Sequence, residues 1–187
     1  MEEITRDIIE RAAGGDMEAF EAIYKAVSGL VFNLALRITN SRPDAEEATQ
    51  DIFLKIYDNL RYFEFRSSFK TWVYRIAANT AINVYNKNIK ERLRRVDFDT
   101  VIETTGNSSG IREAAQSSDA RKLLSSLLES LTPEHRAAIV LREIEGLSYE
   151  EIARALGEKL NTVRTRLKRA RQALLELAKK AVQNELR

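Results

Sequence analysis

Apolar residues recur at helical spacing along almost the whole chain, and no alternation of apolar and polar residues is long enough to predict a strand. The only two prolines, Pro43 and Pro133, each stand where a helical pattern begins. Proline is tolerated at the first position of a helix because the N–H group that it lacks has no partner there. The sequence therefore predicts an all-α protein.

The helical pattern is lost between residues 96 and 118, where Ser, Thr, Asn and Gly accumulate. A segment of this composition buries too little apolar surface to order itself. We therefore expect two small helical domains, residues 1–95 and 119–187, joined by a flexible linker at 96–118.

The composition argues against several classes of protein. With no cysteine and a single histidine, His135, the chain has no disulfide framework and no Cys or His cluster for a metal. We find no paired nucleophile and base and no phosphate loop, so we expect no enzyme activity, cofactor or small-molecule substrate. The acidic N-terminus and the absence of an apolar run of transmembrane length predict a cytoplasmic protein with no direct membrane insertion.

The C-terminal domain has the pattern of a helix-turn-helix. Ser148 and Glu151 have the spacing of a capping box, and Gly157 permits a turn at the end of the short helix that they begin. The next helix places its apolar side chains on one face, namely Val163, Leu167, Ala170, Leu174 and Leu177. In a helix-turn-helix the second helix enters the DNA major groove.

The other face of this second helix is cationic. It carries Arg164, Thr165, Lys168 and Arg169, with Arg166 and Arg171 at the borders, and the segment 161–171 contains no acid. The net charge of +2 hides this asymmetry, because the excess of cations belongs to the C-terminal domain. A charged helix face is often simply solvated, but the capping box and glycine turn favour DNA as the partner.

The helix that starts at Pro43 has an acidic face that also carries Leu54 and Tyr57. Apolar side chains set among polar ones mark a protein interface. Alternatively, Leu54 and Tyr57 pack beneath a neighbouring helix.

A second signal of the N-terminal domain is a run of aromatic residues between 62 and 85, beside one polar stripe formed by Arg75, Asn79, Asn83 and Asn86. Aromatic rings and amides suit unstacked bases, which are held by stacking and by hydrogen bonds to their edges. The aromatic residues could equally form a core, which we expect for Trp72.

Three blocks, residues 44–60, 65–83 and 131–174, resemble the signature blocks of extracytoplasmic-function (ECF) sigma factors, the small two-domain sigma factors of bacterial RNA polymerase. Their order and spacing agree from Asp16 to Leu175. One difference is Asn161, which stands where many members have glycine, although Asn is a good N-cap.

The resemblance implies three contact surfaces. The first, which docks on the clamp helices of the polymerase's largest subunit, is Glu47, Gln50, Asp51, Leu54 and Tyr57. The second, which melts and reads the −10 element, is Phe65, Arg66, Ser67, Ser68, Phe69, Lys70, Arg75, Asn79 and Asn83, with Asn79 capturing an extruded base. The third, which reads the −35 duplex, is Thr162, Arg164, Thr165, Lys168, Arg169 and Arg171, the last two on phosphates.

The implied partners are core RNA polymerase, through its clamp helices and flap region, promoter DNA, and an anti-sigma factor that can tether the protein to the inner membrane. The linker would run through the active-site and RNA-exit path of the polymerase. We therefore expect an alternative sigma factor that starts transcription of a stress or envelope-response regulon. The alternative is a stand-alone helix-turn-helix regulator, which would bind paired half-sites without polymerase.

Overall fold

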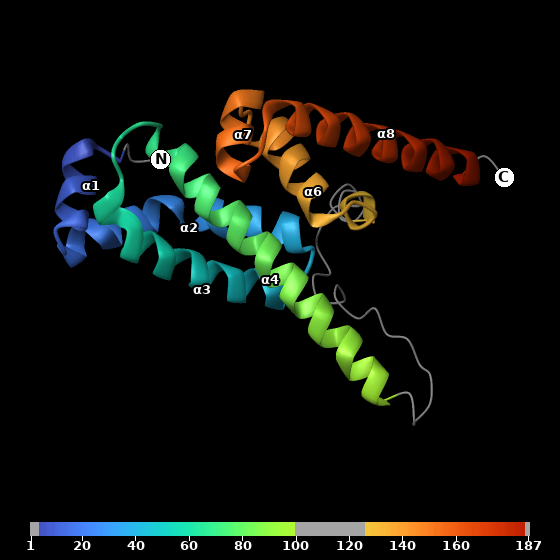
Figure 1. Ribbon diagram of the computed structural model, residues 1–187, viewed down its shortest axis with the longest axis horizontal. Coiled ribbons are helices and arrows are strands. Elements are labelled where there is room, and N and C mark those ends of the chain that lie inside the picture. Colours follow the sequence, from blue (N-terminus) through green and yellow to red (C-terminus); the bar gives the residue numbers. More distant parts are fainter. Residues whose placement is uncertain (1–3, 100–125, 186–187) are drawn as a thin grey trace.

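The protein has 187 residues, and its computed structural model describes residues 4–99 and 126–185. Every regular element within these two ranges is helical, which confirms the all-α prediction (Figure 1).

The N-terminal half is a bundle in which α2, α3 and α4 pack against one another (Figure 1). Its elements are α1 (Arg6–Ala13), α2 (Met17–Thr39), α3 (Arg42–Asn59), the 3-10 turn η1 (Leu60–Tyr62) and α4 (Phe69–Asp99). Asp16 and Ser41 accept backbone hydrogen bonds as N-caps of α2 and α3, and Pro43 lies in the first turn of α3. Ile23, Leu34 and Ile52 are completely buried between these helices.

The C-terminal half consists of a helical segment at 126–129, α6 (Pro133–Ile139), one π-helical turn η2 (Val140–Ile144), α7 (Tyr149–Leu156) and α8 (Leu160–Glu185). Thr132 caps α6 directly before Pro133, as the sequence predicts. Leu141, Ile152 and Leu167 form its core.

The two halves touch along two pairs of helices. Helix α7 lies against α4, and α6 lies against α2 (Figure 1). The C-terminal end of α4 projects past the other helices of the bundle (Figure 1), and residues 91–94 are exposed. Helix α4 also continues to Asp99, four residues beyond the domain end expected at 95, because 96–99 keep the helical conformation. The rest of the expected linker, 100–118, lies outside the described residues.

Helix α2 corrects the expectation that the chain has no apolar run of transmembrane length. Met17–Thr39 is long and apolar enough to span a membrane by length and composition alone. Its completely buried positions, Ile23, Val31, Leu34 and Ile38, lie in the protein core, and the helix packs against α1, α3, α4 and α6. This packing accounts for the apolar composition, because a helix covered on several sides needs few polar positions.

Candidate nucleic-acid interface

The helix-turn-helix forms as the sequence predicts. The Glu151 N–H donates to Ser148 Oγ at 3.2 Å, and the Ser148 N–H donates to the Glu151 carboxylate at 2.8 Å, so the capping box begins α7. Gly157 ends α7 in the left-handed conformation with φ 66°, which costs glycine little because it has no Cβ. The chain then enters α8 at Leu160.

Helix α8 has one packed face and one exposed face. Val163, Leu167 and Ala170 are buried against the domain core. The exposed positions are Arg164, Thr165, Lys168, Arg169 and Arg171, whereas Thr162 is half-buried. In the part of the chain that the structure describes, Arg164, Lys168 and Arg169 form no ion pair, so their charges are available to a polyanion.

Two other cations of α8 are already paired. Arg171 donates to Glu143 at 2.6 Å and to the Tyr149 hydroxyl at 3.3 Å, and Arg166 donates to Glu158 at 2.8 Å. The acids precede the segment 161–171, so a count within that segment misses them. Glu143 partly neutralises Arg171, which is therefore a weaker candidate for phosphate contact than Arg169.

The loop before α4 is held by a cluster of aromatic rings centred on buried Phe63. The Phe63 ring lies 4.7 Å from Phe65, 5.6 Å from Phe69 and 5.2 Å from Trp72 between centroids. Phe65 has φ 57°, a conformation that is strained for a bulky residue, and the guanidinium of Arg6 lies 4.5 Å from its ring. Trp72 is half-buried against the core, in line with the structural role expected for it.

The polar stripe of α4 begins beside this loop. Arg75 is exposed, and Asn79 is half-buried because α7 lies over it. The Asn79 side-chain amide donates to the Arg75 carbonyl at 2.8 Å and to the Ala155 carbonyl of α7 at 3.0 Å. The amide that we expected to read a base is thus engaged by the C-terminal half of the same chain.

A small cavity of about 230 Å³ lies at the same junction. It is lined by Arg66, Ser67, Thr71, Trp72, Arg75, Arg154 and Ala155. Arg66, Ser67 and Arg75 belong to the loop and stripe expected to bind the −10 element, and Arg154 and Ala155 belong to α7. Helix α7 therefore covers part of the expected single-strand surface.

Helix α3 presents an acidic and apolar face. Leu54 and Tyr57 remain 64% and 46% exposed, which rules out their burial beneath a neighbouring helix. Gln50 is exposed, and Asp51 and Glu47 are half-buried. Glu47 accepts hydrogen bonds from Asn88 and Lys87, each at 3.0 Å, and these donors lower the pKa of its carboxyl group.

Side chains that the sequence analysis did not assign join the two halves. Arg136 of α6 is buried and donates to the carbonyl of Ile38, at the C-terminal end of α2, at 2.9 Å. Glu145 accepts a hydrogen bond from the Tyr74 hydroxyl and lies 3.5 Å from Arg37. Burial and this acceptor raise the pKa of Tyr74 well above its ordinary value, so the hydroxyl keeps its proton.

One local signal pointed to Arg136. It stands three and four residues before Ile139 and Val140, on the apolar face of the helix. A cation on such a face requires buried acceptors. Its neighbour His135 is half-buried, and burial together with nearby Arg166 lowers the pKa of its imidazole.

Family models match both halves of the chain. Sigma-70 region 2 matches residues 23–91, and Sigma-70 region 4 matches residues 121–174. The chain shares 36% identity over 174 residues with the ECF RNA polymerase sigma-E factor of Escherichia coli K12, an alignment that covers 89% of this chain and 90% of the relative.

The chain belongs to the ECF sigma factors.

A second relative, the ECF RNA polymerase sigma factor SigE of Mycolicibacterium smegmatis, is 34% identical over 161 residues. That alignment covers 84% of this sigma factor and 61% of the relative, so this chain spans less than two thirds of the longer protein. Sigma factors are transcription initiation factors, and this chain is an alternative RNA polymerase sigma factor.

Two solved structures resemble this sigma factor at 26% identity. The sigma factor RpoE in complex with the anti-sigma factor NepR from Bartonella quintana gives a TM-score of 0.64, covering 86% of this chain and 96% of that one. CnrH in complex with the cytosolic domain of CnrY gives a TM-score of 0.65, covering 95% of this chain and 99% of that one.

Proposed function

We propose that the three surfaces of this sigma factor divide promoter opening among them. The α3 face binds the clamp helices of core RNA polymerase, the loop and stripe at the start of α4 bind the −10 element, and the exposed face of α8 reads the −35 duplex. The observation that supports this division best is α8, where a buried apolar face lies opposite three cations that form no ion pair with any residue in 4–99 or 126–185.

Within α8, position along the helix supports a division of labour. Arg164 lies near the helix start, with Thr165 and Lys168 on the same exposed face, so these three side chains contact base edges, with Thr162 beside them. Arg169 binds a phosphate. Arg171 contributes a weaker phosphate contact because Glu143 shares its charge.

Within the −10 surface, Asn79 hydrogen-bonds an extruded base. Phe65, Arg66, Ser67, Ser68 and Phe69 form the loop that receives the strand, and Lys70, Arg75 and Asn83 flank its backbone. In the arrangement that the structure shows, Asn79 donates to the Ala155 carbonyl of α7, and we call this arrangement closed. Helix α7 must move away from the stripe before Asn79 can contact a base.

The two similar solved structures support regulation of this protein by an anti-sigma factor. Both are complexes, one with an anti-sigma factor and one with a cytosolic domain, and we extend this to an anti-sigma factor that holds the present protein in the cytoplasm, free or at the inner membrane. The regulon would be one of stress or envelope response.

Asn79→Ala tests the −10 assignment. With core polymerase on a promoter selected from a genomic library by run-off transcription, the variant should melt the −10 element less well, by about 1–3 kcal/mol, since a base-specific hydrogen bond is lost. Permanganate reactivity measures melting, and binding to a duplex that carries the −35 element alone serves as the control. Parental melting by Asn79→Ala would show that Asn79 does not read a base.

A further inference from the structure

The loop between η1 and α4, residues 63–68, has a strained residue near its centre, and we call this segment the −10 loop. Phe65 has φ 57°, which costs free energy for a bulky side chain, so contacts with the rest of the protein must hold it there. Its ring lies 4.7 Å from that of Phe63 between centroids. Phe63 is buried and ties the loop to the core, whereas Phe65 is exposed.

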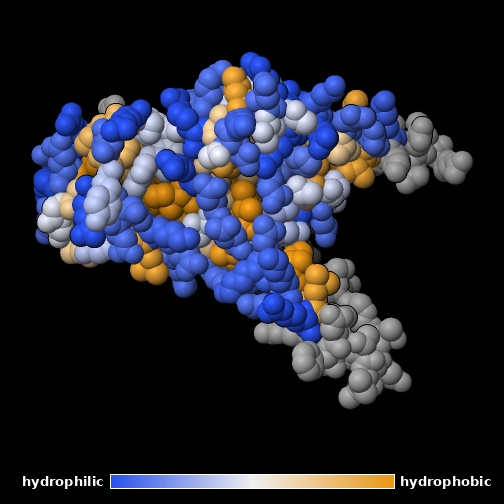
Figure 2. Space-filling view, in the orientation of Figure 1, coloured by the Kyte–Doolittle hydropathy of each residue, from blue (hydrophilic) through white to orange (hydrophobic). Residues whose placement is uncertain are grey.

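At the surface, the Phe65 ring contacts Arg6, the first residue of α1. The guanidinium carbon lies 4.5 Å from the ring centroid, within the range of a cation–π contact. Arg6 Nε also donates to the Glu10 carboxylate, one turn later on α1, at 2.7 Å. This second bond fixes the guanidinium, because residues four apart lie on one helix face. Apolar and strongly hydrophilic residues lie side by side in the region of α1 and the −10 loop (Figure 2).

Helix α1 is fixed to the bundle, so it can hold the −10 loop in a defined place. Ile9 and Ala12 are buried in the core. Arg11 donates to Asp16, the N-cap of α2, at 2.6 Å. Helix α1 also packs against η1, directly before the −10 loop (Figure 1).

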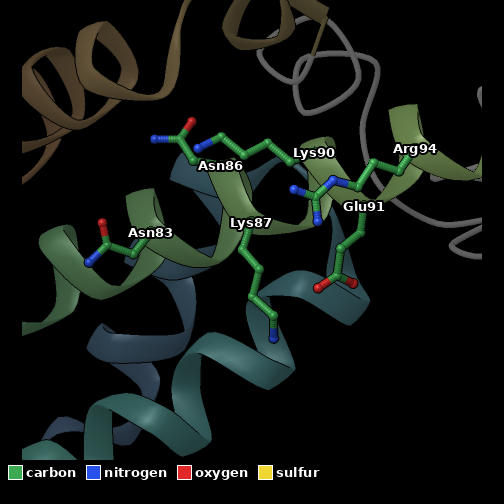
Figure 3. Close-up of a pocket in the computed structure, with 6 residues that line it drawn as sticks. All are labelled: Asn83, Asn86, Lys87, Lys90, Glu91 and Arg94. Carbon is green, nitrogen blue, oxygen red and sulfur yellow. The ribbon is translucent and has the colours of Figure 1, made fainter.

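Helix α4, which follows the −10 loop, is held by ion pairs at its C-terminal half. Lys87 lies 3.0 Å from Glu47 of α3, and Arg92 lies 2.9 Å from Asp44. Figure 3 shows Lys87 directed toward α3. These pairs position α4 and with it Asn79, and Arg6 gives the corresponding support to the loop that precedes the helix.

We propose that Arg6 is a positioning residue of the −10 loop, whose guanidinium holds the Phe65 ring in the orientation that receives the −10 strand. The proposal rests on the −10 role proposed above for this loop. Arg6 acts through Phe65 and does not touch DNA. A ring that is held in place before the strand arrives loses less freedom on binding, so Arg6 raises the affinity by preorganisation.

The test uses preformed holoenzyme and a forked template that carries the −10 element of a selected promoter as a single strand. Arg6→Gln removes the cation and keeps a long polar side chain. It should bind the template about two- to fivefold more weakly, which is the size of an exposed cation–π contact. Arg6→Lys keeps a cation beside the ring and should recover most of this loss.

A second substitution separates positioning from a general effect on the fold. Phe65→Leu removes the aromatic ring and should weaken binding to the template on its own. Adding Arg6→Gln to Phe65→Leu should cause no further loss, because no ring is left to hold. The salt slope of binding should equal that of the parent in each variant, since no phosphate contact is lost.

Arg42→Gln is the matched control. Arg42 is the first residue of α3 and pairs with Glu46, as Arg6 is the first residue of α1 and pairs with Glu10. The two arginine side chains are 74% and 72% exposed. The control therefore removes the same charge at the same kind of position, and it should bind the template like the parent.

Parental binding by Arg6→Gln, together with weaker binding by Phe65→Leu, would overturn the role of Arg6 and leave the −10 role of the loop intact. An equal loss with Arg42→Gln would also overturn it. So would an additive loss in the Phe65→Leu background or a salt slope lower by about one, because Arg6 would then contact DNA directly. Parental binding by Phe65→Leu would refute the −10 role of Phe65 and the positioning role with it.

Discussion

At the scale of single residues, local pairing distinguishes side chains that a sequence pattern treats alike. Arg164 and Arg171 are both exposed arginines of α8, yet Arg171 is engaged by Glu143 and Tyr149, whereas Arg164 contacts the side chain of Asn161 at 3.3 Å. Asn161 thus lies beside the proposed base-reading arginine at the position where many ECF members have glycine.

Arg164→Ala should weaken holoenzyme binding to the cognate −35 element by roughly 1–3 kcal/mol and relax preference at one base pair, because arginine pairs bidentately with a guanine edge. Arg169→Ala, the control from the same face, should weaken all promoters alike and reduce the salt slope by about one. The measurement is affinity across single-base −35 variants at several salt concentrations. A uniform loss with Arg164→Ala would assign base reading to another residue.

At the scale of helices, the accurate predictions are those that depend on residues three or four positions apart. The capping box of Ser148, the turn at Gly157 and the buried face of α8 are local patterns, and the structure contains all three. The contacts of Asn79 with Ala155 and of Arg136 with Ile38 span 76 and 98 positions, so no local pattern encodes them. The exposure of Leu54 likewise depends on where the neighbouring helices pack, so the sequence pattern alone does not predict it.

The exposed face of α3 gives a prediction for polymerase binding. Leu54→Arg should weaken binding to core polymerase by at least about 2 kcal/mol, because a charge would be desolvated in an apolar contact, while the stability of the free protein stays unchanged. Leu93→Arg, at 60% exposure on α4, is the matched control. Competition for core polymerase against the parent measures both. If Leu54→Arg competes for core polymerase as well as the parent does, α3 is not part of the polymerase interface.

Substitution by alanine at two glycines should change the free energy of unfolding in opposite directions. Gly157 has φ 66°, so Gly157→Ala should lower the free energy of unfolding by about 1 kcal/mol even though no atom would clash with the new Cβ. Gly29 lies in the middle of α2 with open space around it, so Gly29→Ala should raise that free energy by up to about 1 kcal/mol. Urea unfolding of the intact protein measures both, and shifts of the same sign would contradict the assigned backbone conformations.

At the scale of the whole molecule, the two halves are held together by polar side chains as well as by packing. Glu145 contacts Tyr74 and Arg37, both in the other half, and Arg136 donates its guanidinium to the end of α2. A cation at a helix C-terminus is favoured by the helix dipole and by the carbonyls left without partners there. These contacts favour one relative position of the two halves, the closed arrangement.

Glu145→Ala should open the molecule, because it removes contacts that join the halves. We expect the closing equilibrium to weaken by about 1–2 kcal/mol, a factor of roughly 5–30. Glu143→Ala is the control, since Glu143 pairs with Arg171 in its own half. Energy transfer between dyes on α1 and α8 should decrease for Glu145→Ala alone. An equal decrease for both variants would indicate damage to the C-terminal half and not release of the contact.

The hydrogen bond between Asn79 and Ala155 occupies the side-chain amide that we propose to bind a promoter base. If the Asn79 amide serves a promoter base, closure and promoter engagement exclude each other, and apparent affinity falls by the fraction of molecules that are open. With closed molecules a hundred times more abundant than open ones, the apparent dissociation constant would be about a hundred times larger than the intrinsic one. A partner that prefers the closed form would silence transcription in proportion to its concentration without touching DNA. Core polymerase that prefers the open form would reverse this by mass action.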